Sequence, residues 1–255
     1  MKKIAIGFIV ICAVVPLVLA ASATAADKFP SKRITYKICF NPGGESDITA
    51  RFQEAALKKA LGVDVAITYQ VGGGGALCWA ELVKTNPDGY TIAGHNLPHT
   101  VLQPLEMGNA GYNTLDLKQI YFFESTPNVL FVRSDSPYKT LADFVEAAKK
   151  HPPGVFTVGG SGSSSANDLG TTMFNKAAGI KLTYIPFGGT GSAVPALLGG
   201  HVTALMSYST MAVQHKDRFR ALAIASEERM EVLPDVPTFK EAGYAMQDRR
   251  LVGPD

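Results

Sequence analysis

The stretch Phe40–Phe52, "FNPGGESDITARF", decides the fold of this chain. It joins an apolar run of strand length, Thr35–Phe40, to a helical pattern over Ser46–Leu61. Gly43 and Gly44 stand between them, where the backbone can turn tightly and a ligand can approach closely. Because a helix N-terminus carries unpaired N–H groups and a partial positive charge, such a loop is a natural seat for a carboxylate or a phosphate.

Three further loops repeat this pattern of strand, glycines and helix start: "VGGGGALCWAEL" (71–82), "VGGSGSSSANDLG" (158–170) and "IPFGGTGSAVPALLGG" (185–200). A single loop of this kind is more often an ordinary turn. Four of them, two in each expected domain, favour a shared anion site outside the carboxyl ends of the strands. The candidate groups of the last three loops include Gly74 and the hydroxyls of Ser161, Ser163, Ser164, Ser165 and Thr190, and Ser46 adds one in the first.

Binding energy also favours a site shared between domains. One hydrogen bond to a charged group contributes about 1.5–3 kcal/mol, whereas micromolar affinity requires about 8 kcal/mol. We therefore expect loops of two domains to close over one ligand.

Strand-length apolar runs alternate with amphipathic helical patterns, which indicates an α/β architecture with mainly parallel sheets covered by helices. The expected strands are 35–40, 63–69, 90–94, 119–123, 129–132, 155–158, 183–186, 202–206 and 220–225. The expected helices are 46–61, 76–84, 141–150, 165–178 and 192–198, and Thr140 with Asp143 is typical of a helix start.

The order of these patterns predicts two domains and a hinge. The segment 106–118 interrupts the alternation, so we expect 27–120 to form the first part of domain 1 and 121–220 to form domain 2. The strand at 220–225 is expected to lead the chain back, with 221–255 returning to domain 1.

Residues 1–26 read as a cleavable signal peptide for export. Lys2 and Lys3 precede an uncharged apolar run, and "ASATAAD" supplies small residues for cleavage after Ala25 or Ala26. Cleavage removes two lysines and no acid, which leaves a formal net charge of zero. Bulk charge therefore recruits neither nucleic acid nor an anionic membrane.

Cys39 and Cys78 are the cysteines of the expected mature chain. Export permits a disulfide between them, but single cysteines in apolar contexts are often buried hydrophobic residues, so the sequence leaves the pairing open.

The familiar catalytic and cofactor motifs are missing from the sequence. No glycine loop is followed by Lys-Ser or Lys-Thr, and the strand ending "ITYQV" lacks the acid that a ribose would require, so no nucleotide cofactor is expected. Pro98 between His95 and His99 opposes a shared helical face, so no metal is expected. The expected alternative is a polar loop after a strand, "GHNLPHT", that lines the same cleft. A secreted serine hydrolase using Ser161 or Ser163 is the alternative function, although "GGSGS" lacks the closing glycine of a nucleophile elbow.

Asp47 permits two interpretations. It is either a first-turn acid that stabilises the helix start, which we favour, or an acceptor for a ligand amine or hydroxyl.

Six segments in fixed order carry a family resemblance. They read "NPGGESDITAR", "GGGGA…AELVKTNPDGYTI", "TPNVLFVRSDSPYKTLADFVEAAKKHP", "VGGSGSSSANDLG", "YIPFGGTGSAVPALLGGHVTAL" and "RALAIASEERMEVLPDVPTFKEAGY". From Pro30 to Tyr244 the chain resembles the substrate-binding proteins of tripartite tricarboxylate transporters, also called Bug receptors.

The resemblance implies a monomeric, periplasmic binding protein of the two-domain Venus flytrap type (type II) without catalytic activity. Such a receptor delivers a small carboxylate to a membrane permease of one large and one small transmembrane subunit; a ligand-sensing subunit of a signalling system is the other role open to it. Its loops imply ligand-binding roles for Gly43, Gly44, Ser46, Asp47, Ser161, Gly162, Ser163, Ser164, Ser165, Gly189, Thr190 and Gly191.

Three features depart from the family pattern. Glu45 stands where a small residue is common, and Gly188 stands where many members have lysine. Members also continue beyond "RRLVGPD", so the resemblance predicts a truncated chain with an incomplete domain 1.

Overall fold

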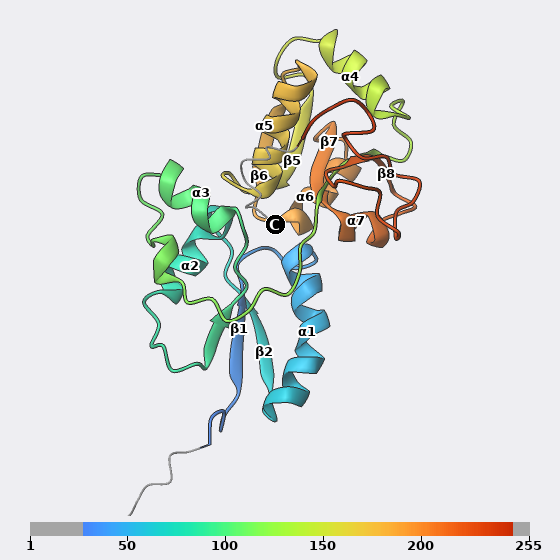
Figure 1. The fold of residues 1–255 in the computed structure, drawn as a ribbon. Helices are drawn as coiled ribbons and strands as arrows, with labels where there is room; N and C mark the ends of the chain where they lie inside the picture. The colour runs from blue at the N-terminus through green and yellow to red at the C-terminus, as the bar shows by residue number, and fades with distance from the viewer. Residues whose placement is uncertain (1–27, 247–255) are drawn as a thin grey trace, which may run out of the picture.

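The computed structural model describes residues 28–246 of the 255-residue chain. The expected signal peptide and residues 247–255 lie outside the described residues. The described residues form two lobes, each built on its own sheet (Figure 1). We call residues 28–117 the first lobe, residues 128–246 the second lobe and residues 118–127 the connecting segment.

The first lobe contains a three-stranded parallel sheet of order β2-β1-β3. Its elements are β1 (Ile34–Ile38), α1 (Glu45–Leu61), β2 (Val65–Tyr69), η1 (Gly73–Gly75), α2 (Ala76–Leu82), β3 (Thr91–Ala93), α3 (His99–Glu106) and η2 (Thr114–Asp116). One apolar cluster joins β1 to α1, and another surrounds the fully buried Trp79 of α2.

Cys39 and Cys78 form a disulfide inside the cluster around Trp79, with their Cα atoms 5.3 Å apart. This settles the pairing that the sequence left open. The bridge ties the end of β1 to α2.

The second lobe contains a five-stranded sheet of order β6-β5-β7-β4-β8. Its elements are β4 (Asn128–Arg133), α4 (Leu141–Lys149), β5 (Thr157–Ser161), α5 (Ala166–Ala178), β6 (Thr183–Phe187), α6 (Thr190–Leu198), β7 (Ala204–Tyr208), α7 (Ser209–Gln214) and β8 (Phe219–Ile224). β5 runs parallel to β6 and β7, whereas β4 runs antiparallel to β7 and β8. The expected mainly parallel α/β architecture is therefore confirmed.

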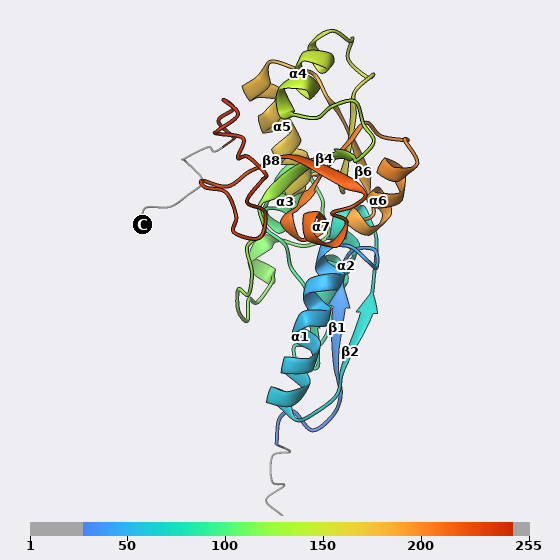
Figure 2. The same cartoon turned by 90° about the vertical axis from the view of Figure 1, so that its right-hand side faces the viewer.

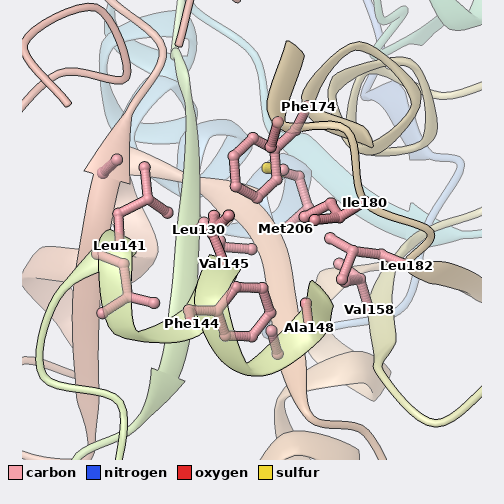
Figure 3. Packing of buried hydrophobic residues seen from close by; sticks show 14 of the residues in the cluster. Leu130, Leu141, Phe144, Val145, Ala148, Val158, Phe174, Ile180, Leu182 and Met206 are labelled. Atoms are coloured by element: carbon pink, nitrogen blue, oxygen red, sulfur yellow. The ribbon is translucent and has the colours of Figure 1, made fainter. Parts of the chain in front are cut away.

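Helices cover both faces of the five-stranded sheet. Successive residues of β4 alternate between the two faces, so Leu130 joins a cluster with α4 and α5 while Phe131 joins a cluster with α6 and α7. Figure 3 shows the first cluster, in which Phe144 and Phe174 pack toward Leu130 and Met206. Burial on both faces holds the ends of β5 and β7 in place beside the first lobe.

The start of α4 was predicted from its capping residues. Thr140 and Asp143 form the capping box that starts α4, as expected.

The sequence missed α3, which contains Pro104. Pro104 has no N–H to donate to the Thr100 carbonyl, and the hydroxyl of Thr114 donates to that oxygen at 2.7 Å instead. The six-residue helix α7 was missed as well.

Two expectations about the chain path were wrong. Residues 119–123 form no strand, because this apolar run lies in the connecting segment, where no strand of the described residues pairs with it. Residues 221–246 do not return to the first lobe. β8 pairs with β4, and Phe239 and Met246 pack into the apolar cluster of the second lobe, so the described chain crosses between lobes once.

Candidate functional site

A small cavity lies where the two lobes meet. Figure 2 shows β1 and β2 pointing with their carboxyl ends toward the second lobe, which brings the loops after the strands into contact with it. The cavity measures about 10 Å³, room for about one water molecule, so the lobes are closed on each other. Its lining consists of Phe40, Glu45, Ser46, Asn96, His99, Ser161, Thr190 and Tyr208.

The loop before α1 packs against the loop before α6. The Glu45 N–H donates to Thr190 Oγ1 at 3.0 Å, and the Asn41 N–H donates to the Gly188 carbonyl at 3.1 Å. A Cβ at Gly44 would lie 2.8 Å from the Gly191 nitrogen. The glycines thus allow the two helix starts to approach across the lobes.

Gly188, one of the departures from the family pattern, has a structural reason here. A Cβ at this position would overlap the side-chain oxygen of Asn41 in the opposite lobe. A lysine at this position would therefore require the Asn41 side chain to move.

The second pair of glycine loops meets in the same way. A Cβ on Gly162 would lie 2.5 Å from the Gly74 Cα, and a Cβ on Gly74 would lie 3.3 Å from the Ser163 carbonyl oxygen. Both glycines have positive φ, +72° and +62°, which side chains rarely adopt. All four predicted glycine loops therefore lie at the junction of the lobes.

Asp47 holds the first loop rather than facing the cavity. Its carboxylate accepts from the Gly43 N–H at 2.7 Å, from Tyr69 Oη at 2.7 Å and from Arg51 Nε at 2.8 Å. Burial alone would raise the pKa of Asp47, but these hydrogen bonds outweigh it and lower the pKa. The geometry matches the structural interpretation of this residue.

The four predicted serines of the third loop separate into different environments. Ser161 lines the cavity, and its hydroxyl donates to Asn167 Oδ1 at 2.6 Å. Ser165 is the N-cap of α5, and the Ser164 N–H donates to Asp168. Ser163 is exposed and does not line the cavity. Within the described residues, neither the Ser161 nor the Ser163 hydroxyl hydrogen-bonds to a histidine, the usual base of a serine hydrolase.

Five residues of the cavity were not predicted as site residues: Phe40, Glu45, Asn96, His99 and Tyr208. Phe40 was assigned only to the strand before the first loop, and Tyr208 carries no sequence signal because it lies outside the glycine loops. Glu45 was noted as a family departure, and the loop with Asn96 and His99 was predicted only as a polar loop that lines the cleft.

Glu45 and His99 are buried with unpartnered atoms. Burial raises the pKa of Glu45 and lowers that of His99 to about 4, with the Ser161 backbone opposing the second shift only in part. Within residues 28–246, Glu45 Oε1 and both ring nitrogens of His99 have no hydrogen-bond partner of normal geometry, although the Ser161 backbone lies near the His99 ring. His95, in contrast, contacts Thr100 and Gln119, so the two histidines do not act together.

A larger cavity, of about 490 Å³, lies on the first lobe beside β3. Apolar side chains such as Ile92 and Ile120 line it, together with His95, and none of the predicted site residues does.

Across residues 28–246, no helix is both long and apolar enough to cross a membrane.

The sequence matches the family "Tripartite tricarboxylate transporter family receptor" over residues 49–253. A curated relative from Agrobacterium vitis, the "UPF0065 protein in the TAR-I ttuE-ttuC' intergenic region", is 31% identical over 224 residues, which cover 87% of this chain and 64% of the relative. The chain thus spans a little under two thirds of that relative's length.

Solved structures agree in fold. The periplasmic binding protein BugD is 28% identical with a TM-score of 0.79, and the match covers 85% of this chain and 73% of BugD. MatC from Rhodopseudomonas palustris, solved with bound malate, is 30% identical with a TM-score of 0.76, covering 85% and 74%. Family and fold are those of substrate-binding receptors, and the chain belongs to the tripartite tricarboxylate transporter receptor family.

Proposed function

We propose that this chain is a periplasmic receptor that captures a small carboxylate and delivers it to a tripartite tricarboxylate transporter permease. The observation that carries the proposal is the meeting of the α1 and α6 starts at the inter-lobe cavity. The first amides of a helix have no intrahelical acceptor and carry partial positive charge. Two such starts, from two lobes, offer a carboxylate more donors than either lobe alone.

Hydroxyls complete the anion site that we propose. Ser46 lines the cavity, and Thr190 Oγ1 accepts from the Glu45 N–H, which leaves its own proton for a ligand. Gly43, Gly44, Gly189 and Gly191 serve by letting the loops approach, and Asp47 serves by orienting Gly43.

We propose that the connecting segment, which includes the expected boundary at 120–121, acts as a hinge. The cavity in this unliganded arrangement is too small for a carboxylate of several carbons. The lobes must therefore separate to admit the ligand, and they close over it less tightly than they close on each other here. Binding then favours the closed form through its higher affinity for that form. A loaded, closed receptor is the form that a permease would recognise.

Titration calorimetry with a panel of carboxylates tests the proposal. Ser46→Ala and Thr190→Ala should each weaken binding about ten- to hundredfold, because each removes a hydrogen bond to a charged group worth about 1.5–3 kcal/mol. Ser163→Ala, in an exposed serine of the same site region, is the matched control and should bind as the wild type does. Failure of every carboxylate to bind would exclude the receptor function.

Transport itself requires a second test. Uptake of the bound carboxylate should depend on this receptor and on the two transmembrane subunits together. Uptake that persists without the receptor, with loss of a ligand-dependent transcriptional response instead, would point to the sensing role.

A further inference from the structure

The inter-lobe cavity contains a carboxylate with one oxygen that no protein group satisfies. Glu45 opens α1, and only 5% of its surface is exposed. Its Oε2 accepts from the hydroxyl of Thr210, whereas Oε1 has no hydrogen-bond partner of normal geometry among residues 28–246. The Thr126 hydroxyl lies near the carboxylate and opposes the rise in its pKa, but burial is the larger effect. Since buried acceptors are nearly always satisfied, Oε1 is available to a donor on a ligand.

Two more acceptors face the same cavity. His99 is 1% exposed, and its low pKa of about 4 makes the ring neutral at pH 7, with one nitrogen able to accept. Ser161 uses its hydroxyl proton toward Asn167, so its oxygen retains lone pairs for the cavity. This side of the cavity therefore favours a ligand group that is rich in donors.

The charges around Glu45 favour a positive group. No lysine or arginine belongs to the described residues that line the cavity. Glu124 lies near enough that burial, and then the charge of Glu45, raise its pKa to about 7. A second ligand carboxylate would add a like charge to this region, whereas an ammonium would relieve the repulsion.

We propose that the ligand is a small zwitterionic amino acid, with its ammonium on Glu45 Oε1 and its carboxylate at the starts of α1 and α6. This inference rests on the proposed receptor function and narrows its ligand class. A dicarboxylate or tricarboxylate without an amino group has no cationic donor for Oε1, since a hydroxyl such as that of malate donates only a neutral hydrogen bond. Its second carboxylate would also add a negative charge beside Glu45 and Glu124.

Matched ligands isolate the contribution of the amino group. Aspartate, malate and succinate share a four-carbon diacid skeleton, and alanine, lactate and propionate share a three-carbon acid skeleton. We expect calorimetry on the wild-type protein to show that the amino acid of a set binds at least tenfold more tightly than the two acids without an amino group. The other common L-amino acids extend the measurement.

Variants of α1 test the assigned residue. Glu45→Gln should reduce the preference for the amino member to less than threefold, because the amide is uncharged and nearly the same size. Glu45→Asp should retain part of the preference, since it keeps the charge. Glu54→Gln is the control: Glu54 lies on the same helix, pairs with Lys58 and does not line the cavity, so the preference should persist.

The outcomes separate this inference from the receptor function. Malate or succinate binding as tightly as aspartate, with lactate equal to alanine, would overturn the amino-acid assignment and leave the receptor function standing. A wild-type protein that binds no carboxylate, with or without an amino group, would overturn both. The ranking within each set is measured on the wild type, so it decides the question even if Glu45→Gln does not fold.

Discussion

Glu45 and Glu124 place two carboxyl groups in a partly desolvated region at the start of α1. Burial is the larger cause of the raised pKa in both, and the mutual charge adds to it for Glu124. Such groups destabilise the unliganded fold in their ionised form. Binding residues of this kind contribute to recognition at the expense of stability, which is typical of functional sites.

Replacing Glu124 with glutamine should stabilise the protein relative to the wild type, and more so as the pH rises from 4.5 to 7. The pKa of Glu124 is about 7 in the folded state against an ordinary 4.5. A raised carboxyl pKa contributes stability below pH 4.5, and this contribution is lost as the pH rises through 7.

Urea unfolding of both proteins at pH 4.5, 5.5, 6.5 and 7.5 measures this difference. His99, with its lowered pKa, has the opposite pH dependence, but it is common to both proteins and cancels in the difference. A difference that stays constant over this range would show that the pKa of Glu124 is not raised.

At the scale of elements, the starts of α1 and α4 use the same chemistry for different purposes. Asp47 accepts from the Gly43 N–H, and Asp143 accepts from the Thr140 and Lys139 N–H groups at 2.9 and 3.0 Å. Both carboxylates stabilise a helix start. The difference is that the first loop lies at the lobe junction and the second lies far from it.

Asp47→Ala and Asp143→Ala form a matched pair that tests this distinction. Each should lower the free energy of unfolding by about 1 kcal/mol, because each removes a helix-start acceptor. Asp47→Ala should also weaken ligand binding, since the loop before α1 loses its anchor, while Asp143→Ala should leave affinity unchanged. Urea unfolding and calorimetry give the two quantities, and equal affinities in the two variants would argue against a positioning role for Asp47.

At the scale of the whole molecule, glycines permit the lobes to close. A side chain at Gly191 would overlap the Pro42 carbonyl oxygen, and one at Gly162 would meet the backbone of Gly74. These contacts join residues far apart in sequence and exist only when the lobes are together. Glycine is therefore needed here for closure rather than for the fold of either lobe.

Gly191→Ala should hold the lobes apart and weaken ligand binding without destabilising α6, because alanine is the better helix former by about 1 kcal/mol. Gly162→Ala should act similarly but with added backbone strain, since its φ is +72°. Gly154→Ala is the control for that strain: its φ is +94° and a Cβ there meets nothing within 4 Å.

Small-angle scattering in the presence of a bound ligand measures the opening. The radius of gyration should exceed that of the wild type for Gly191→Ala and Gly162→Ala, and should match it for Gly154→Ala. Wild-type dimensions and affinity in Gly191→Ala would show that the contact with Pro42 does not limit closure.

The local pattern of apolar and polar residues was sufficient to predict most of the strands and helices of this protein. Strand and helix periods predicted eight of the strands now described and the helices α1, α2, α4, α5 and α6, because these signals depend on neighbours along the chain. The glycine loops were recognised for the same reason. Pattern failed at α3, where a hydroxyl from a later segment satisfies the carbonyl that Pro104 leaves free, and at 119–123, where no partner strand exists among the described residues.

The sequence by itself thus determined the α/β class, the four glycine loops and their place at helix starts. Only the tertiary structure decided which loops pair across the lobes, that Ser161 rather than Ser163 lines the cavity, and that Glu45 and His99 are buried there with unpartnered atoms. Contact between the lobes brings together residues more than 80 positions apart, such as Gly74 and Gly162. The periodicity of apolar residues within one segment cannot predict such contacts. Burial and its effect on charge follow from that packing, because desolvation depends on what surrounds a group in space.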